Sequence, residues 1–304
     1  MLKHLSLFNK KVEKVPSLIK WTGSKRKSVD QILKYFPKKI NKYYEPFLGS
    51  GSVLYAVKSI YPNIEVYGSD IYKPLIEIFK TISKNPEKIK KAYRDDWNKL
   101  QKNFPKYFYI KRDKFNKKNN FQDLIFLSRT CVNGIIRFNK KKEFNNSLHL
   151  SRRGMTPKLF DKIVDNWFLN IKDNSSFRCC DYPDILNDLK KNDFVYLDPP
   201  YLNSKNRYVS NLEFKRFLKF LEEINKKKIL YALSFDGSRD EISLDKAFPK
   251  KLFKRKIKIK KTISTLSNVL NKKKLNFTES LYLNYWKFYL FGVNNIFFKF
   301  LIYI

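Results

Sequence analysis

One short segment of the chain combines residue types that could bind and activate a planar base. The apolar run 194–197 predicts a buried strand, and Asp198, Pro199, Pro200 and Tyr201 follow it directly. Neither proline has an N–H and each fixes its own φ, so the turn should hold a carboxylate and a backbone carbonyl rigidly beside an aromatic ring. Two aligned acceptors next to a stacking face suit a base with an exocyclic amino group. The alternative is a strand followed by an ordinary proline turn.

A glycine turn near the amino end is the second candidate. Residues 43–54 read as a short strand, a turn containing Gly49 and Gly51, and a helix. Glycine permits positive φ and close backbone approach, but such a turn is weak evidence by itself. Asp70 ends a second predicted strand, and an acid about 20 residues beyond a glycine turn commonly binds ribose hydroxyls. Because Leu54 stands where a dinucleotide fingerprint needs a third glycine, we expect an adenosine ligand without phosphates.

These segments together resemble a known family. With the Lys-Trp-Thr-Gly-Ser-Lys segment at 20–25, the segments 45–51 and 198–201 occur in the order of the Dam-type, or D12 class, DNA adenine-N6 methyltransferases. Residues 128–145 are similar to the target-recognition segment of that family, and the resemblance covers nearly the whole chain. Ser24 is a departure, because the family usually has a glycine there.

The resemblance implies an α/β fold: a Rossmann-like S-adenosylmethionine-dependent methyltransferase sheet with an inserted, mainly helical DNA-recognition domain. We expect residues 1–83 and 166–304 to form the catalytic domain. Residues 84–165 are assigned to the insert, because they lack regular strand–helix alternation and carry many basic and aromatic residues. Two further strands of the sheet are predicted at 176–181 and 228–236.

The resemblance also implies a reaction, the transfer of a methyl group from S-adenosyl-L-methionine to N6 of an adenine flipped out of duplex DNA. Asp198 and the carbonyl of Pro199 would accept the N6 hydrogens, Pro200 would stiffen the loop and Tyr201 would stack on the base. The reaction needs no metal, and the few histidines and cysteines show no metal-binding spacing.

Cofactor contacts are implied in two loops and at three strand ends. The residues are Trp21, Lys25, Phe47, Gly49, Gly51, Asp70, Asp181 and Asp198. The tryptophan and the lysine would lie near the methionine moiety, and the first of the three aspartates would hold the ribose hydroxyls. Asp181 would accept a hydrogen bond from the cofactor's adenine amine, with Tyr182 or Phe177 against the ring. The alternative for Asp181 is a helix N-cap.

Four residues are assigned to DNA binding: Arg129, Asn133, Arg137 and Asn139. Arg137 and Asn133 are the expected base-edge readers, since arginine reads guanine and asparagine reads adenine in the major groove. Arg129 is expected to contact phosphates, which position the protein without specifying sequence. A hairpin is predicted over residues 133–146, and the Asn-Gly pair at its start is also compatible with an ordinary hairpin turn.

Composition agrees with a polyanionic partner. The chain has 64 Lys+Arg against 28 Asp+Glu, a formal net charge of +36. Such an excess favours binding to a phosphate backbone, although it does not distinguish DNA from RNA. The basic residues form no amphipathic stripe, so we expect no membrane association. Three cysteines give no disulfide framework and the amino end has no continuous apolar stretch, so we expect a cytoplasmic protein.

Other function classes remain open. An RNA methyltransferase or a DNA N4-cytosine methyltransferase would share the strand-end tetrapeptide and the glycine turn. A protein-glutamine methyltransferase would more typically have asparagine in place of Asp198, and a pure DNA-binding module would not need the acids Asp70 and Asp181. The family resemblance further implies a monomer, with a cognate restriction endonuclease as a partner that shares its DNA site.

Overall fold

The computed structural model describes residues 14–200, 212–239, 242–243, 248–261 and 277–286. Tyr201 therefore lies outside the described residues. Within the described ranges, no helix has the length and apolar character needed to cross a bilayer.

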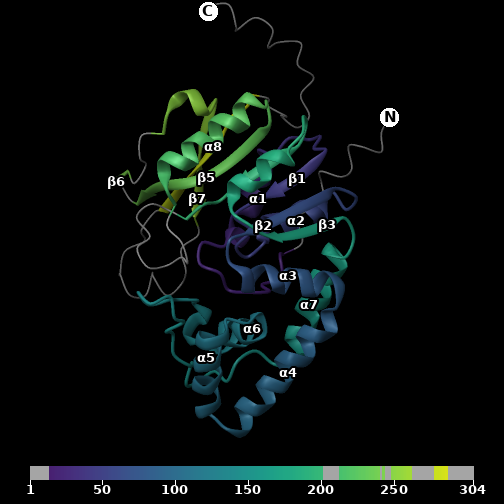
Figure 1. The fold of residues 1–304 in the computed structure, drawn as a ribbon, viewed down its shortest axis with the longest axis vertical. Coiled ribbons are helices and arrows are strands. Elements are labelled where there is room, and N and C mark those ends of the chain that lie inside the picture. The colour runs from purple at the N-terminus through teal and green to yellow at the C-terminus, as the bar shows by residue number, and fades with distance from the viewer. Residues whose placement is uncertain (1–13, 201–211, 240–241, 244–247, 262–276, 287–304) are drawn as a thin grey trace, which may run out of the picture.

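A single mixed sheet forms the upper half of the molecule (Figure 1). Its strand order is β3-β2-β1-β4-β5-β8-β7, with β6 paired to β5. Strands β1 to β5 run parallel to one another, whereas β8 runs antiparallel to both of its neighbours, β5 and β7. The expected α/β fold is confirmed. The strands are β1 Lys42–Glu45, β2 Glu65–Asp70, β3 Ser175–Cys179, β4 Phe194–Leu197, β5 Leu230–Arg239, β6 Ile242–Ser243, β7 Arg255–Lys261 and β8 Phe277–Leu283.

Helices cover the sheet and build the lower half of the molecule. In Figure 1, α8 lies over the upper part of the sheet, α4 to α6 form the lower part, and α3 and α7 lie between them. The α-helices are α1 Val29–Leu33, α2 Ser52–Ile60, α3 Lys73–Lys84, α4 Pro86–Lys102, α5 Lys106–Lys118, α6 Phe121–Thr130, α7 Pro157–Ile171 and α8 Phe214–Lys226. Short 3₁₀ turns are η2 Lys25–Lys27, η3 Val132–Gly134, η4 Tyr182–Asn187 and η5 Lys250–Leu252.

Strand β4 shows why the sheet is buried on both faces. All four of its residues are buried, and successive side chains point to opposite faces of a strand. Phe194 and Tyr196 pack in one hydrophobic cluster, while Val195 and Leu197 pack in the cluster under α8. A strand covered on both faces needs an apolar side chain at every position, which the run at 194–197 supplies.

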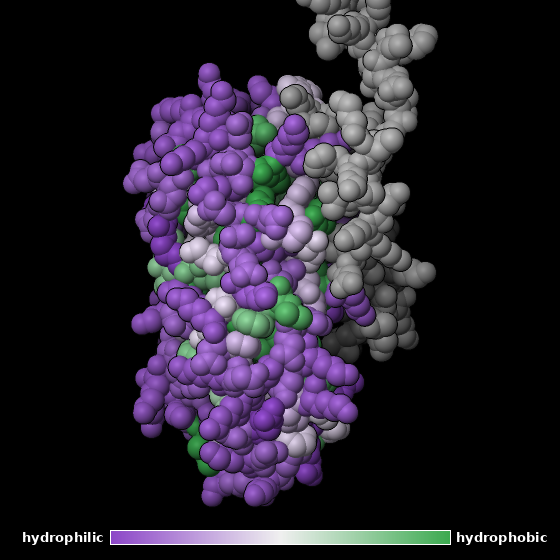
Figure 2. Space-filling view, turned by 90° about the vertical axis from the view of Figure 1, so that its right-hand side faces the viewer, coloured by the Kyte–Doolittle hydropathy of each residue, from purple (hydrophilic) through white to green (hydrophobic). Residues whose placement is uncertain are grey.

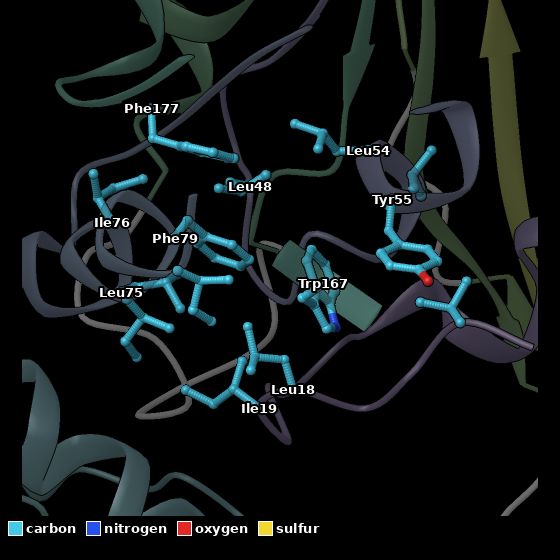
Figure 3. Close-up of a cluster of buried hydrophobic side chains, with 14 of the residues drawn as sticks. Leu18, Ile19, Leu48, Leu54, Tyr55, Leu75, Ile76, Phe79, Trp167 and Phe177 are labelled. Carbon is cyan, nitrogen blue, oxygen red and sulfur yellow. The ribbon is translucent and has the colours of Figure 1, made fainter. Parts of the chain in front are cut away.

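The core below the glycine turn joins the sheet to the helices. Figure 3 shows Leu48, Phe79, Trp167 and Phe177 gathered there. Trp167 is completely buried, and its indole N–H donates to the carbonyl of Pro16 at 3.0 Å. This packing holds the turn after β1 against the core, and the same turn lines the cavity described below.

The helical lower part contains a buried ionic cluster. Lys111 contacts Asp96 and Asp123, and the hydroxyl of Tyr107 donates to Asp96 at 2.6 Å. The apolar side chains of this helical part belong to the same hydrophobic cluster as those of α2 and α3. The mainly helical character expected for this segment is observed, and the boundary at residues 84–165 stays our proposal.

Candidate active site

A cavity of about 270 Å³ opens where the carboxyl ends of the parallel strands meet. This edge is the usual ligand site of open α/β sheets. The sequence-predicted residues that line it are Trp21, Lys25, Phe47, Gly49, Asp70, Asp181, Asp198 and Pro200. The structure therefore brings the amino-terminal loop, the glycine turn and the proline turn around one space.

Asp70 holds the glycine turn against β2. The N–H of Gly49 donates to Asp70 Oδ2 at 3.1 Å, and the N–H of Tyr72 donates to Oδ1 at 3.0 Å. Burial raises the pKa of Asp70 to about 6, although these backbone donors favour its ionised form. Gly49 has φ +48, and a Cβ there would lie 3.0 Å from Cδ1 of Trp21. Glycine at this position thus lets the turn and the tryptophan ring meet.

Gly51 was predicted to line the pocket, but it does not reach the cavity wall. It precedes α2 with φ +64, and its N–H donates to the carbonyl of Leu48 at 2.8 Å. A Cβ at this position would lie 3.0 Å from Phe79 and 3.1 Å from Trp167. Its role is to let the turn pack on the core, and its effect on the cavity is indirect.

Lys25 is directed at the carboxylate of the proline turn. Its side chain is 3% exposed, and its Nζ donates to Asp198 Oδ1 at 2.5 Å and to the carbonyl of Gly23 at 3.2 Å. The same Nζ lies 2.9 Å from Glu279 Oε1. Burial lowers the pKa of Lys25, but the two carboxylates outweigh burial and raise it well above its usual value. The side chain is therefore a fixed cation.

Glu279 is a site residue that the sequence reasoning missed. It lies on β8 with a side chain 1% exposed, behind Lys25 as seen from the cavity. Burial raises its pKa to about 7, and repulsion from Asp198 acts in the same direction while Lys25 opposes it. A signal was present, because the period of two along a strand puts Glu279 on the same face as Leu281 and Leu283. An acid on the apolar face of a strand indicates a buried ion pair.

A second buried carboxyl lies on the cavity wall at the end of β1. The hydroxyl of Tyr43 donates to Glu45 Oε2 at 2.6 Å. Burial raises the pKa of Glu45 to about 8, and the charge of Asp198 adds to this shift. Glu45 is therefore mostly neutral at pH 7, whereas Asp198 is paired with the ammonium of Lys25. Glu45 was not predicted as a site residue.

Asp181 is the N-cap of η4, as its alternative role predicted, and it also lines the cavity. Its Oδ1 accepts from the N–H of Tyr182 at 2.8 Å, and the carboxylate of Asp184 accepts from the N–H of Asp181 at 3.0 Å, so it caps η4. It also lines the cavity, where Nη1 of Arg216 donates to its Oδ2 at 2.6 Å. Arg216 is a further cavity residue that was not predicted.

The aromatic side of the cavity is formed by Tyr182 and Phe47, whose ring centroids lie 5.2 Å apart in a stacked pair. Phe177, the alternative to Tyr182, is buried in the core and stacks on Phe79 at 5.4 Å. The structure thus favours Tyr182 as the ring that faces a ligand.

Ser24, which stands where the family usually has glycine, belongs to a group of hydrogen-bonded hydroxyls. The hydroxyl of Ser50 donates to Ser24 Oγ at 2.8 Å, and Ser52 Oγ lies 3.0 Å from Ser24 Oγ and 2.7 Å from Ser50 Oγ. All three side chains line the cavity. The substitution therefore joins the amino-terminal loop to the start of α2.

The recognition segment forms a hairpin whose tight turn is not at Asn133. Phe138 and Phe144 form an antiparallel bridge, and Asn139 Oδ1 accepts from the N–H groups of Lys141 and Glu143 at 2.9 and 3.0 Å. Asn139 is therefore occupied in shaping the turn. The predicted hairpin is present, but Asn133 has φ +55 in a separate 3₁₀ turn.

Arg137 and Asn133 lie on the exposed side of this segment. Nε of Arg137 donates to Asn145 Oδ1 at 3.0 Å, which orients its guanidinium. The turn at Asn133 contacts the amino-terminal loop, because Lys20 Nζ donates to the carbonyl of Asn133 at 3.5 Å. The recognition segment and the loop that leads to Lys25 are thus adjacent.

Arg129 does not fit its predicted phosphate contact. Its side chain is buried in α6, where Nη2 donates to the carbonyl of Leu18 at 2.6 Å. Burial lowers its pKa to about 10. Because it lies in the apolar part of the helix and ties α6 to the amino-terminal segment, we remove it from the candidate DNA contacts.

Pro199 follows β4 at the cavity edge but is not part of the cavity wall, unlike its neighbour Pro200. Among the described residues, no group of three or more His, Cys, Asp and Glu side chains is arranged to hold a metal ion.

Comparisons with known proteins agree with this geometry. A family model described as D12 class N6 adenine-specific DNA methyltransferase matches residues 21–285. Type II methyltransferase M.MjaIII of Methanocaldococcus jannaschii is 30% identical over 249 residues, covering 72% of this chain and 84% of that protein. A DNA adenine methylase of Haemophilus influenzae is 31% identical over 192 residues, covering 60% of this chain and 63% of the relative. Type II methyltransferase M.FokI of Planomicrobium okeanokoites is 30% identical over 247 residues, 74% of this chain but 38% of that protein.

Proposed function

The chain belongs to the D12 class N6 adenine-specific DNA methyltransferase family, and we propose that it transfers a methyl group from S-adenosyl-L-methionine to N6 of an adenine in a specific duplex DNA site. The observation that carries this proposal is the buried Lys25–Asp198 pair, which holds a carboxylate of the proline turn at the wall of a cavity also lined by the glycine turn.

The amino group of adenine is a poor nucleophile because its lone pair is delocalised into the ring. Asp198 and the carbonyl of Pro199 accept the two N6 hydrogens, which favours a tetrahedral nitrogen and stabilises its developing positive charge. Pro200 keeps these acceptors in register, and Tyr201 stacks on the base. When bound, the donor supplies a methyl group already activated by a sulfonium, so the protein contributes positioning and electrostatics.

The cavity fits such a donor. Its Phe47–Tyr182 stack suits an adenine ring, and Asp181 lies beside this pair as an acceptor for the ring's amine. Asp70 faces the same space and can accept from ribose hydroxyls. Trp21 and Lys25 border the remaining part, toward Asp198, where the methionine moiety would lie.

DNA binding is proposed for the hairpin side of the molecule. Arg137 and Asn133 are the proposed base readers, and Asn139 contributes by shaping the turn. The face of the molecule in Figure 2 is largely hydrophilic, in keeping with the net charge of +36 that favours a polyanion. We further propose a monomer acting in the cytoplasm, with a cognate endonuclease as its biological partner.

The test is transfer of labelled methyl from S-adenosylmethionine to AT-rich duplex DNA, followed by nucleoside analysis. N6-methyladenine is the expected product, and sequencing of the modified sites would define the target. Label in N4-methylcytosine would keep the mechanism and change the base. Label in RNA or protein, with none in DNA, would refute the proposal.

A further inference from the structure

Three charged groups form a buried line that leads away from the cavity. Asp198, 19% exposed, and Lys25, 3% exposed, both border the cavity, and Glu279, 1% exposed, contacts Lys25 without lining the cavity. The contacts are 2.5 Å between Asp198 Oδ1 and Lys25 Nζ, and 2.9 Å between Lys25 Nζ and Glu279 Oε1. A single ammonium thus touches the reactive carboxylate on one side and a second carboxylate on the other.

Methylation of an amino group leaves a proton to be removed. When the N6–C bond forms, the S–C bond of the donor breaks and its electron pair stays on sulfur as a neutral thioether. The positive charge moves to N6, and neutral N6-methyladenine results only when N6 loses one proton. Asp198 is the proposed hydrogen-bond acceptor at N6, so it is the first group that can take this proton.

We propose that Glu279 is the terminal acceptor of this proton and acts through Lys25. Asp198 takes the proton from N6. Lys25 then passes one of its three ammonium protons to Glu279 and, in the same step, takes up the proton of Asp198. Lys25 ends as it began, a cation, while Glu279 ends as a neutral acid. This inference rests on the proposed function, and it makes Glu279 a positioning and proton-accepting residue that touches neither substrate nor donor.

The surroundings favour this direction of transfer. Burial raises the pKa of Glu279 to about 7, so it binds a proton more tightly than an ordinary carboxylate does. Lys25, by contrast, is held in its charged form by its two carboxylate partners. Protonation of Glu279 relieves the repulsion between it and Asp198 across the ammonium.

Few other titratable groups face this line among the described side chains. Tyr196 of β4 interacts with all three members, and Glu45 of β1 interacts with Asp198 and Lys25. Tyr43 bonds to Glu45. Burial raises the pKa of both tyrosines well above their usual value, and that of Glu45 to about 8, so these groups are mostly neutral at pH 7. Glu279 is thus the group of this set whose ionisation changes most around neutral pH.

Glu279→Gln is the matched substitution, since glutamine keeps the size and a carbonyl acceptor for Lys25 but cannot take a proton. We expect the single-turnover methyl-transfer rate at pH 8 to fall by about 10²-fold, the lower end of general-base effects. The wild-type rate should rise with pH around a midpoint of about 7, and this rise should be absent in the variant. Base flipping, followed by 2-aminopurine fluorescence, should be nearly unchanged.

Asp123→Asn is the control, because it also neutralises a carboxylate that is 1% exposed and paired with a lysine, in the helical part of the chain. Its pH profile should match that of the wild type. A Glu279→Gln variant with the wild-type rate and profile would overturn the inference and leave the proposed function intact. If that variant does not fold, a flat wild-type profile between about pH 6 and 8.5 overturns it equally. No transfer by the wild type at any pH would instead refute the proposed function.

Discussion

Replacing Lys25 by methionine should destabilise the protein, because the buried carboxylate of Glu279 then loses its partner. Removing one partner of a buried ion pair destabilises a protein by about 3–5 kcal/mol, because the other charge stays uncompensated. Asp198 borders the cavity and can be hydrated, so most of this penalty should come from Glu279, which is 1% exposed. Lys25→Met combined with Glu279→Gln leaves only an imperfectly paired amide, at about 1–3 kcal/mol. The double variant should therefore be about 2 kcal/mol more stable than Lys25→Met.

The stability of the Lys25→Met variant should also change with pH in a defined direction. The pKa of Glu279 is raised from 4.5 to about 7 in the folded wild type, and loss of Lys25 should raise it further. A carboxyl whose pKa is higher in the folded state is stabilising when protonated, so its contribution is lost as pH rises from 4.5 through the folded pKa. Over this range the free energy of unfolding falls by about 1.4 kcal/mol per pH unit. Lys25→Met should thus recover part of its stability relative to wild type between pH 8 and pH 6.

Urea unfolding of the protein without cofactor, followed by tryptophan fluorescence, measures these free energies, provided that the m-values agree. The reasoning would be refuted by a Lys25→Met variant within about 1 kcal/mol of the wild type at pH 8. It would also be refuted by a double variant no more stable than the single one. Neither variant should transfer methyl groups, so restored stability must not restore activity.

Three further variants test the site and the turn. Asp198→Ala should abolish methyl transfer while DNA affinity in a gel-shift assay stays nearly unchanged; retained turnover would remove its assigned role. Arg137→Ala should relax the sequence choice seen by sequencing methylated DNA, with little change in the salt slope of binding, whereas a slope reduced by about 1 would identify a phosphate contact. Gly51→Ala should cost about 2–5 kcal/mol in urea unfolding, from about 1–2 for the left-handed backbone and about 1–3 for crowding against Phe79 and Trp167. A stability within about 0.5 kcal/mol of wild type would contradict the packing argument.

The sheet and the cavity wall were largely predictable because their signals are local. The strand before Asp198 is indicated by the apolar run that precedes it directly. The glycine turn and the strand that ends at Asp70 are likewise indicated by residues close to them in the sequence. Parallel strands then bring their carboxyl ends to one edge whatever the length of chain between them. The predicted strand at 176–181 came out as Ser175–Cys179, which moves Asp181 into the cap of the next turn.

Side-chain partners across long separations were not predictable in the same way. Nothing near Lys25 in the sequence indicates that Asp198 and Glu279 become its neighbours, because β8 reaches this position only by running antiparallel to β5. Arg129 was misassigned for a related reason. It was read as one of many basic residues in a basic segment, but it follows the apolar residues 124–127 on a helix that the fold buries.

The charges at the cavity fit both halves of the proposed reaction. At pH 7 Glu45 is mostly neutral, Glu279 is close to its midpoint, and Lys25 is a cation paired with the carboxylate of Asp198. With Glu279 ionised, the three-residue line carries a net negative charge, which favours a cationic donor. Once the methyl group has moved, the positive charge of the donor is on N6 and must leave it as a proton. Glu279 is the group whose protonation removes the excess negative charge of the three residues. A carboxylate with an ordinary pKa would favour binding of the cationic donor but would not accept the proton. Burial of Glu279 by β8 lets one side chain do both.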